Sequence, residues 1–200
     1  MPSNTWQRLR YTLWAPHYDK VTKFPAERRH SMALLALSPG ERLLIIGCGT
    51  GADIPFVPPE VEVLAVDLTP AMLAEARAHA RPGVTFRQMD GLHLDLPDGS
   101  FDAAILHMVL EVIPEPERCL AEAARVLRVG GRLAVFDKFL PDGARPSSLR
   151  RAALALLDVV FTSTNRQMGD ILERSRAPLA VVHDERSVAA YRHLLLRRTG

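Results

Sequence analysis

The sequence Leu43-Leu44-Ile45-Ile46-Gly47-Cys48-Gly49-Thr50-Gly51 decides the fold. An apolar run of strand length ends here in a glycine-rich turn, and glycine lets a backbone adopt positive φ and approach a ligand closely. A second apolar run, Val63-Leu64-Ala65-Val66, ends in the single carboxylate of Asp67. An acidic side chain about 20 residues after the first glycine can accept hydrogen bonds from two ribose hydroxyls. The two motifs together predict a site for a cofactor that contains adenosine.

The length and the cysteine content limit the class of protein. A chain of 200 residues fits one domain with an ample core, so we expect residues 1–200 to form a single domain. Cys48 and Cys119 form no CxxC pair, which predicts neither a disulfide framework nor a metal site. No apolar run approaches the roughly 18 residues that span a bilayer, and the N-terminus lacks the apolar core of a signal peptide. These features predict a cytoplasmic protein.

The net charge of +2 is unevenly distributed. Residues 1–30 carry six Lys and Arg against two Asp and Glu, and residues 145–200 carry ten against five. Residues 31–144 carry nine against sixteen. Basic ends favour an anionic substrate or peripheral contact with an anionic membrane at the inner face. The alternative is that these arginines only cover solvated faces.

Apolar runs of strand length alternate with runs of helical spacing, which predicts a parallel sheet with helices on both faces. The expected fold is an α/β, Rossmann-like, doubly wound sheet of seven strands, mostly parallel with a late antiparallel strand. We expect strands at about 42–46, 62–66, 84–88, 101–107, 132–137, 179–183 and 191–196. We expect helices at about 26–37, at 70–80 after the N-cap Thr69, from Pro116 to Gly130-Gly131, and within 147–173. Residues 1–25 carry Trp6, Leu9, Leu13 and Trp14 at roughly helical spacing and are predicted to form a lid.

The glycine turn alone fits two kinds of adenosine cofactor. Gly47 to Ala52 satisfies the GxGxxA pattern of NAD-dependent dehydrogenases, and Gly47 to Gly51 satisfies GxGxG. The second pattern resembles motif I of the class I S-adenosylmethionine-dependent methyltransferases. Later residues resemble that family in order and spacing: Asp90-Gly91, Phe101-Asp102, Glu115-Pro116 and the Leu-x-x-Gly-Gly turn at 127–131. The chain also leaves no room for the separate substrate domain of most dehydrogenases.

The resemblance implies S-adenosylmethionine as cofactor, S-adenosylhomocysteine as product, and a set of binding residues. Asp67 would bind both ribose hydroxyls, Leu68 and Met72 would pack on adenine, and Asp90, Gly91 and Leu92 would form the adenine pocket. The other expected cofactor-binding residues are Tyr18, Gly47, Cys48, Gly49, His107 and Met108. Cys48 is interpreted as the small residue that the turn needs, in preference to a reactive thiol.

The chain departs from the family pattern at one position. The third residue of motif I is usually acidic and orients the methionine amino group of the cofactor, whereas this chain has Ile45. Cofactor binding is therefore expected to be weaker, or Asp53, Asp19 or a backbone carbonyl takes over the ammonium group.

The resemblance also narrows the methyl acceptor. Residues 11–19 resemble the opening of the ubiquinone/menaquinone-biosynthesis and phosphatidylethanolamine N-methyltransferase-like enzymes, and 136–139 and 165–172 resemble the soluble bacterial phospholipid branch. The favoured acceptor is an amine such as phosphatidylethanolamine. The alternatives are a quinone-precursor C-methyltransferase, a non-catalytic cofactor-binding protein and an NAD-dependent reductase. Nucleic acid is not expected as a substrate, because no basic stripe is interleaved with aromatic residues.

His107, at the end of a predicted strand, is the expected catalytic residue, because ligands of open α/β sheets bind at the carboxyl ends of strands. A base is needed only where the acceptor must lose a proton. His17, Tyr18 and Glu111 are the other candidates for that role, and no pair of them stands out from the sequence.

Overall fold

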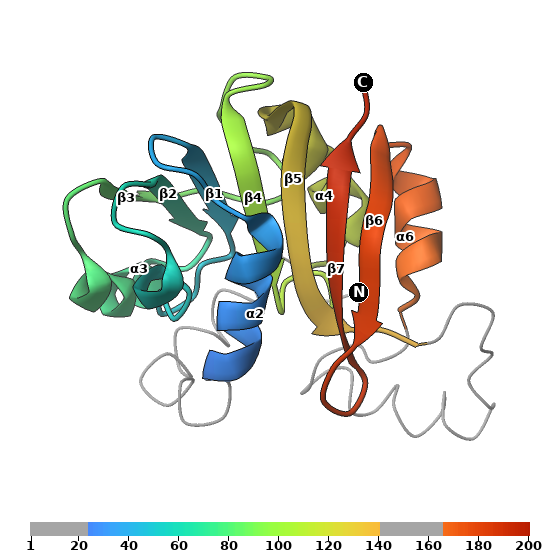
Figure 1. The fold of residues 1–200 in the computed structure, drawn as a ribbon, viewed down its shortest axis with the longest axis horizontal. Coiled ribbons are helices and arrows are strands. Elements are labelled where there is room, and N and C mark those ends of the chain that lie inside the picture. The colour runs from blue at the N-terminus through green and yellow to red at the C-terminus, as the bar shows by residue number, and fades with distance from the viewer. Residues whose placement is uncertain (1–23, 141–165) are drawn as a thin grey trace.

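The computed structural model describes residues 24–140 and 166–200 as a seven-stranded sheet with helices packed on both faces (Figure 1). The predicted lid therefore lies outside the described residues, apart from Phe24 and Pro25. Tyr18, Asp19 and most of the helical segment expected at 147–173 also lie outside them.

The sheet has the predicted mixed topology. Its strands are β1 (Arg42–Ile46), β2 (Glu62–Asp67), β3 (Val84–Gln88), β4 (Phe101–His107), β5 (Leu127–Lys138), β6 (Leu179–Arg186) and β7 (Tyr191–Arg198). They lie in the order β3-β2-β1-β4-β5-β7-β6. Strands β1 to β5 pair in parallel, and β7 is antiparallel to both β5 and β6. The carboxyl ends of the five parallel strands therefore share one edge, the lower one in Figure 1.

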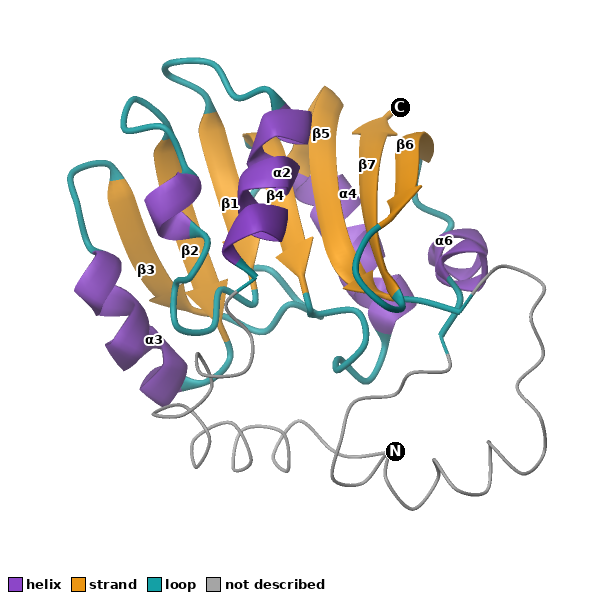
Figure 2. Ribbon diagram, turned by 60° about the horizontal axis from the view of Figure 1, so that its bottom comes forward, coloured by secondary structure: helices purple, strands orange, loops and turns teal. Residues whose placement is uncertain are grey.

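Helices cover the two faces of the sheet unequally (Figure 2). One face carries α2 (Pro25–Leu35), the short 3-10 helix η1 (Ile54–Phe56) and α3 (Pro70–Ala76), which runs on into η2 (Arg77–His79). The other face carries α4 (Pro116–Val126) and α6 (Met168–Ser175). Pro25, Pro70 and Pro116 each occupy the first position of a helix, where the missing N–H costs no hydrogen bond.

Strand β1 shows why the central strands are continuous apolar runs. Leu44 and Ile46 point into the core beneath α4, whereas Leu43 and Ile45 point into the core beneath α2. All four side chains are buried, because successive residues of a strand alternate between two covered faces. The rigid central strands hold the loops at their carboxyl ends in fixed positions.

The predicted end of the helix that begins at Pro116 is wrong. Gly130-Gly131 does not close α4, which already ends at Val126. Leu127 pairs with Phe101 in the sheet, and the register then shifts so that Ala103 faces Arg132. The two glycines lie in this irregular part of β5, where Gly130 has a φ of +79°. Sheet pairing therefore ends the helix before the glycines are reached. The helix expected at 70–80 is also shorter, because α3 changes to 3-10 geometry after Ala76.

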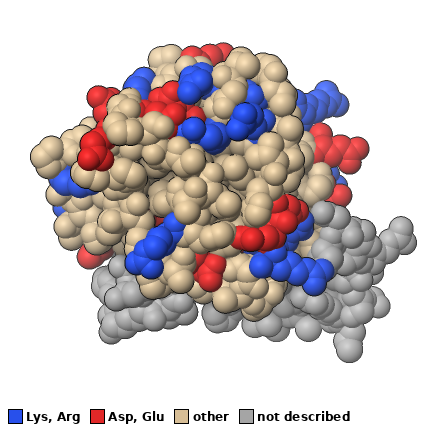
Figure 3. All heavy atoms as spheres, viewed as in Figure 1, with Lys and Arg blue, Asp and Glu red and all other residues tan. Residues whose placement is uncertain are grey.

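Basic side chains on the described surface are interspersed with acidic ones. On the face drawn in Figure 3, Lys and Arg lie among Asp and Glu without forming a single patch of one sign. Arg128 pairs with Asp102, and Arg132 pairs with Glu41. Within the described ranges, no helix is long and apolar enough to cross a membrane.

Arg125 of α4 fastens the connection between β3 and β4 to the body of the protein. Its guanidinium donates to the carbonyl oxygens of Leu94 and Leu96, both at 2.8 Å, and to the carboxylates of Asp98 and Glu122. Hydrogen bonding to Arg125 holds the pKa of Glu122 below its ordinary value. The connection has no regular structure of its own, so these bonds fix its path.

We predict that Arg125→Met lowers the free energy of unfolding by about 1–3 kcal/mol, because two carbonyls lose their donor. Urea denaturation measures the loss. The matched control is Arg118→Met on the same helix, whose exposed pairing with Glu115 at 4.0 Å should contribute less than about 0.5 kcal/mol. Equal losses in the two variants would contradict this role of Arg125.

The same network predicts a pH dependence. The pKa of Glu122 is lowered in the folded protein, so its contribution is complete above the unfolded-state pKa of about 4.3 and is lost as pH falls through the folded-state value. The difference in stability between the wild type and Arg125→Met should therefore narrow in that acidic range.

Candidate functional site

A pocket opens at the carboxyl ends of β1, β2 and β4 and contains most of the predicted site residues. Ten of them line it: Gly47, Cys48, Gly49, Asp67, Leu68, Met72, Asp90, Gly91, His107 and Met108. Leu92 does not. Its N–H donates to Asp90 Oδ1 at 2.9 Å, and its side chain packs in the core beneath α4. Tyr18 lies outside the described residues.

The glycine turn forms the floor of the pocket. Gly47 has a φ of +66°, and a Cβ atom at this position would lie 2.7 Å from Cγ2 of Val109. Gly51 serves packing instead, since a Cβ there would lie 3.1 Å from the side chain of Ala76 on α3. The turn therefore needs glycine at Gly47 to keep a ligand-facing backbone close to the loop after β4.

Asp67 is held at the pocket wall by two backbone donors. Its Oδ2 accepts the Gly49 N–H at 2.9 Å, and its Oδ1 accepts the Thr69 N–H at 2.8 Å. Burial raises the pKa of the Asp67 carboxyl, and these N–H donors offset part of that rise. The two bonds orient the carboxylate at the end of β2, where its remaining lone pairs can accept hydroxyl donors.

The adjoining wall has the mixed character that an adenine ring requires. The side chains of Leu68 and Met72 give apolar surface on one side, while Asp90 and Gly91 supply polar groups after β3. Met72 is also buried, so it packs in the protein and faces the pocket at once. These residues fit the base of a nucleoside, as the family resemblance implies.

A buried ionic chain runs from α2 into the pocket. Arg28 Nη1 lies 2.7 Å from Asp53 Oδ2, and Asp53 Oδ1 lies 2.7 Å from His107 Nδ1. Burial by itself would raise the pKa of Asp53, but His107 and Arg28 outweigh burial and hold it well below its ordinary value. His107 Nε2 is buried and has no hydrogen-bond partner among residues 24–140 and 166–200. Since the ionised carboxylate accepts at Nδ1–H, the tautomer that follows leaves a lone pair on Nε2.

The sequence alone did not predict this series of contacts between Arg28, Asp53 and His107. The sequence predicts Asp53 only as a partner for the cofactor ammonium and assigns no role to Arg28. Asp53 does line the pocket, but each of its oxygens already has a cationic or imidazole partner. The signal that could have found the pair is topological: His107 ends β4, Asp53 follows the turn after β1, and these two strands are neighbours.

Three further predictions can be placed. Ile45, at the usually acidic position, is fully embedded in the apolar core beneath α2. Burial raises the pKa of the Cys48 thiol, which fits the small-residue interpretation rather than a reactive thiolate. Glu111, an alternative candidate for the base, does not line the pocket. Its Oε2 lies 3.5 Å from Lys138 Nζ instead.

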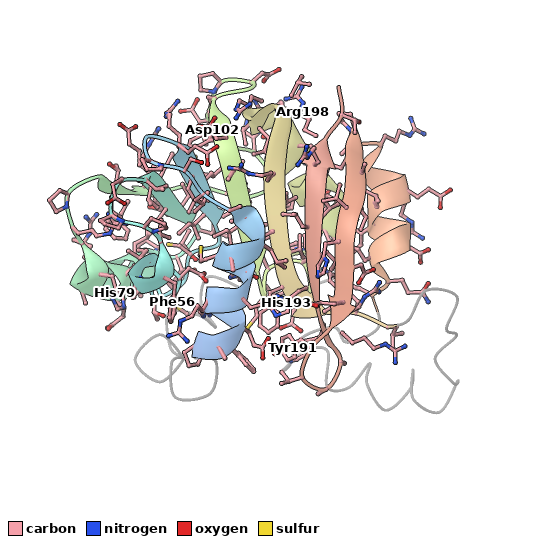
Figure 4. All side chains as sticks on the ribbon, in the orientation of Figure 1. Phe56, His79, Asp102, Tyr191, His193 and Arg198 are labelled. Atoms are coloured by element: carbon pink, nitrogen blue, oxygen red, sulfur yellow. The ribbon has the colours of Figure 1, made fainter. Side chains whose placement is uncertain are left out.

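The remaining wall is apolar. Val109, Val112 and Ile113 follow β4 along the pocket. Met108 has a φ of +57°, a left-handed conformation that is uncommon for residues other than glycine. Its N–H donates to the Phe136 carbonyl at 2.8 Å, and its side chain packs with the rings of Phe136 and Tyr191. The ring of Tyr191, labelled in Figure 4, stacks on Phe136 with 4.8 Å between centroids.

Comparisons with known proteins agree with the geometry. A family model described as a methyltransferase domain matches residues 44–135. The chain is 33% identical over 147 residues to a phosphatidylethanolamine N-methyltransferase of Cereibacter sphaeroides, covering 71% of this chain and 72% of that protein. It is 35% identical over 136 residues to a demethylmenaquinone methyltransferase of Thermus thermophilus, covering 62% of this chain and 61% of that protein.

The fold is shared more widely than the sequence. The solved structure of the [4+2]-cyclase SpnF matches with a TM-score of 0.80 at 20% identity, covering 99% of this chain and 97% of that one. That likeness concerns the fold alone, so the chemistry must be argued from the sequence relatives and from the pocket.

We predict that Asp67→Ala lowers the affinity for S-adenosylhomocysteine at least tenfold, because a carboxylate that accepts two hydroxyl donors is worth roughly 1.5–3 kcal/mol. Isothermal titration calorimetry measures the change. Asp95→Ala, which removes an exposed carboxylate on the β3–β4 connection, is the control and should bind as the wild type does. Unchanged affinity in Asp67→Ala would remove the ribose assignment.

We predict that Gly47→Ala abolishes cofactor binding, since its Cβ meets Val109 and the backbone is strained. Gly40→Ala is the matched control, because Gly40 has a φ of +81° with no atom within 4 Å of its Cβ position. The Gly40→Ala variant has the same strain of a positive φ but no steric clash, so its affinity for S-adenosylhomocysteine should equal that of the wild type. Comparing the two affinities for S-adenosylhomocysteine, with circular dichroism to monitor folding, separates pocket geometry from backbone strain.

Proposed function

The chain belongs to the class I S-adenosylmethionine-dependent methyltransferases, and we propose that it methylates a primary amine of the phosphatidylethanolamine type, with His107 as proton acceptor. The observation that carries the amine is the relative named phosphatidylethanolamine N-methyltransferase, since the alignment spans most of both chains. The observation that carries the proton acceptor is the buried Nε2 of His107 in the pocket, which has no hydrogen-bond partner among the described residues.

The cofactor supplies an activated methyl group, so the protein has to bind it, align the acceptor and exclude water. The backbone of Gly47 and Gly49 would cradle the methionine part, and Asp67 would hold the ribose. Leu68 and Met72 would cover the adenine ring, with Asp90 and Gly91 at its edge. This arrangement leaves the end of β4, with His107 and Met108, next to the place of methyl transfer.

An amine acceptor is protonated at neutral pH and must lose a proton before its lone pair can attack carbon. His107 Nε2 would receive that proton, which converts the ring to an imidazolium. The ionised Asp53 would stabilise this cation through its contact with Nδ1. Arg28 helps to keep Asp53 ionised, and the ionised Asp53 favours the His107 tautomer that carries its proton on Nδ1. The apolar wall at Val109, Val112 and Ile113 excludes water from the same place.

A quinone-precursor C-methyltransferase is the second candidate, favoured by the demethylmenaquinone methyltransferase relative. A ring carbon also needs proton removal, so the same His107 would serve it. The direct test incubates the purified full chain with radiolabelled S-adenosylmethionine and either phosphatidylethanolamine vesicles or a demethylated quinone. Label in the phospholipid supports the amine, and label only in the quinone overturns it in favour of the second candidate.

We predict that His107→Gln lowers kcat on the amine at least a hundredfold while the affinity for S-adenosylhomocysteine changes less than threefold. The control is His79→Gln, which changes a histidine of η2 away from the pocket. The residual rate of His107→Gln should also rise with pH more steeply than that of the wild type. At higher pH a larger fraction of the amine has already lost its proton to solvent before it binds. A loss of cofactor affinity as large as the loss of kcat would make His107 a binding residue instead.

A further inference from the structure

A second cluster of imidazole and carboxylate groups lies where α2 meets the β6–β7 hairpin. His30 comes from α2, and His183 and Glu185 come from β6. Residues two apart on a strand share a face, so His183 and Glu185 point the same way. One candidate ligand atom from each residue lies within 4.8 Å of the other two, and no other such group of three occurs among the described residues. The cluster joins segments that are 155 positions apart.

The two imidazoles converge on one carboxylate. His30 Nε2 contacts Glu185 Oε1, and His183 Nε2 lies 3.3 Å from Glu185 Oε2. Despite this proximity, the buried His183 Nε2 atom makes no hydrogen bond to any residue in the described part of the chain, although the residue itself is only half-buried. Two ring nitrogens and a carboxylate oxygen within 4.8 Å of one another are the kinds of ligand that Zn²⁺ takes in sites with three protein ligands and an open position.

A third histidine, His193 of β7, lies beside the cluster and is hydrogen-bonded to α2. The ring of His193 lies 4.9 Å from the ring of His30. His193 Nε2 is 2.6 Å from Glu27 Oε2, and its Nδ1 is 3.1 Å from Ser31 Oγ. His193, labelled in Figure 4, lies on β7 beside α2. The His193 ring is thereby fixed between α2 and β7, and it limits the space open to the ring of His30.

The charge balance favours a cation. Glu185 and Glu27 both lie at the contact between α2 and the β6–β7 hairpin, and the histidines need not be charged to bind a metal. The neighbouring pair of Arg192 and Asp184 neutralises itself and, by strand alternation, lies on the opposite face of the hairpin. Imidazole ligands favour zinc and similar transition metals over Mg²⁺ and Ca²⁺, which prefer oxygen.

We propose that His30, His183 and Glu185 form a zinc site that fastens α2 to β6, with solvent completing the coordination. The site goes beyond the methyl transfer proposed above and does not depend on it. Its structural consequence concerns the active site, because α2 also carries Arg28, which holds Asp53 and through it His107. A metal that fixes α2 therefore stabilises the support of the pocket from the outer surface.

The test titrates the chelator-treated full chain with Zn²⁺ in the presence of a competing chromophoric chelator, and follows thermal unfolding in parallel. We expect one equivalent of Zn²⁺ to bind and to raise the melting temperature, as any ligand of the folded state does. His183→Gln and Glu185→Gln should each weaken zinc binding at least tenfold. His79→Gln is the control, since Figure 4 places His79 at the other end of the sheet from His193.

Two further measurements keep the proposal open to refutation. Co²⁺ in place of Zn²⁺ should give the visible absorption of a nitrogen- and oxygen-ligated ion, and His183→Gln should lose it. Circular dichroism checks that each variant folds, and the half-exposed positions of His183 and Glu185 make both changes tolerable. Zinc that binds His183→Gln and Glu185→Gln as tightly as His79→Gln would overturn the site, and so would absence of binding to the wild type.

Discussion

The buried carboxylate of Asp53 is the interaction on which the geometry of the pocket depends. It is 3% exposed, and a charge at such depth is tolerated only with partners that replace water. Its partners come from separate parts of the chain: Arg28 from the helix before the first strand, and His107 from the end of β4. One side chain thus joins the helical layer, the loop after β1 and the centre of the sheet. Removing any member would leave a buried charge or donor without its partner.

The same interaction links stability to chemistry. A histidine at the end of a strand can adopt either tautomer, and the one that suits proton acceptance must be selected by a fixed neighbour. Asp53 does this at Nδ1, and Arg28 keeps Asp53 an acceptor. Ile45 and Ile54 belong to the apolar core beneath α2, the helix that carries Arg28.

Much of the fold could be predicted because its central strands are buried on both faces. The apolar runs at Arg42–Ile46 and Phe101–His107 have the same bounds in the sequence and in the structure. Prediction failed where distant pairing overrides a local signal. Gly130-Gly131 looks like a helix stop, yet the pairing of Leu127 with Phe101 ends α4 earlier. The site followed the same rule: the glycine turn and Asp67 are local motifs, whereas the contact between Asp53 and His107 spans 54 positions and exists only in three dimensions.

The likeness to the cyclase SpnF shows that this sheet and its helices do not by themselves determine a reaction. In the function proposed here, the reaction depends on the short segment at the end of β4, where His107 and Met108 line the pocket. The left-handed backbone of Met108 is a conformation that surrounding structure has to impose. Here the Phe136 carbonyl accepts its N–H, and the stacked rings of Phe136 and Tyr191 pack against its side chain. Strand β7, added after the parallel sheet, carries Tyr191, so the C-terminal hairpin helps to hold the segment after β4 that lines the pocket.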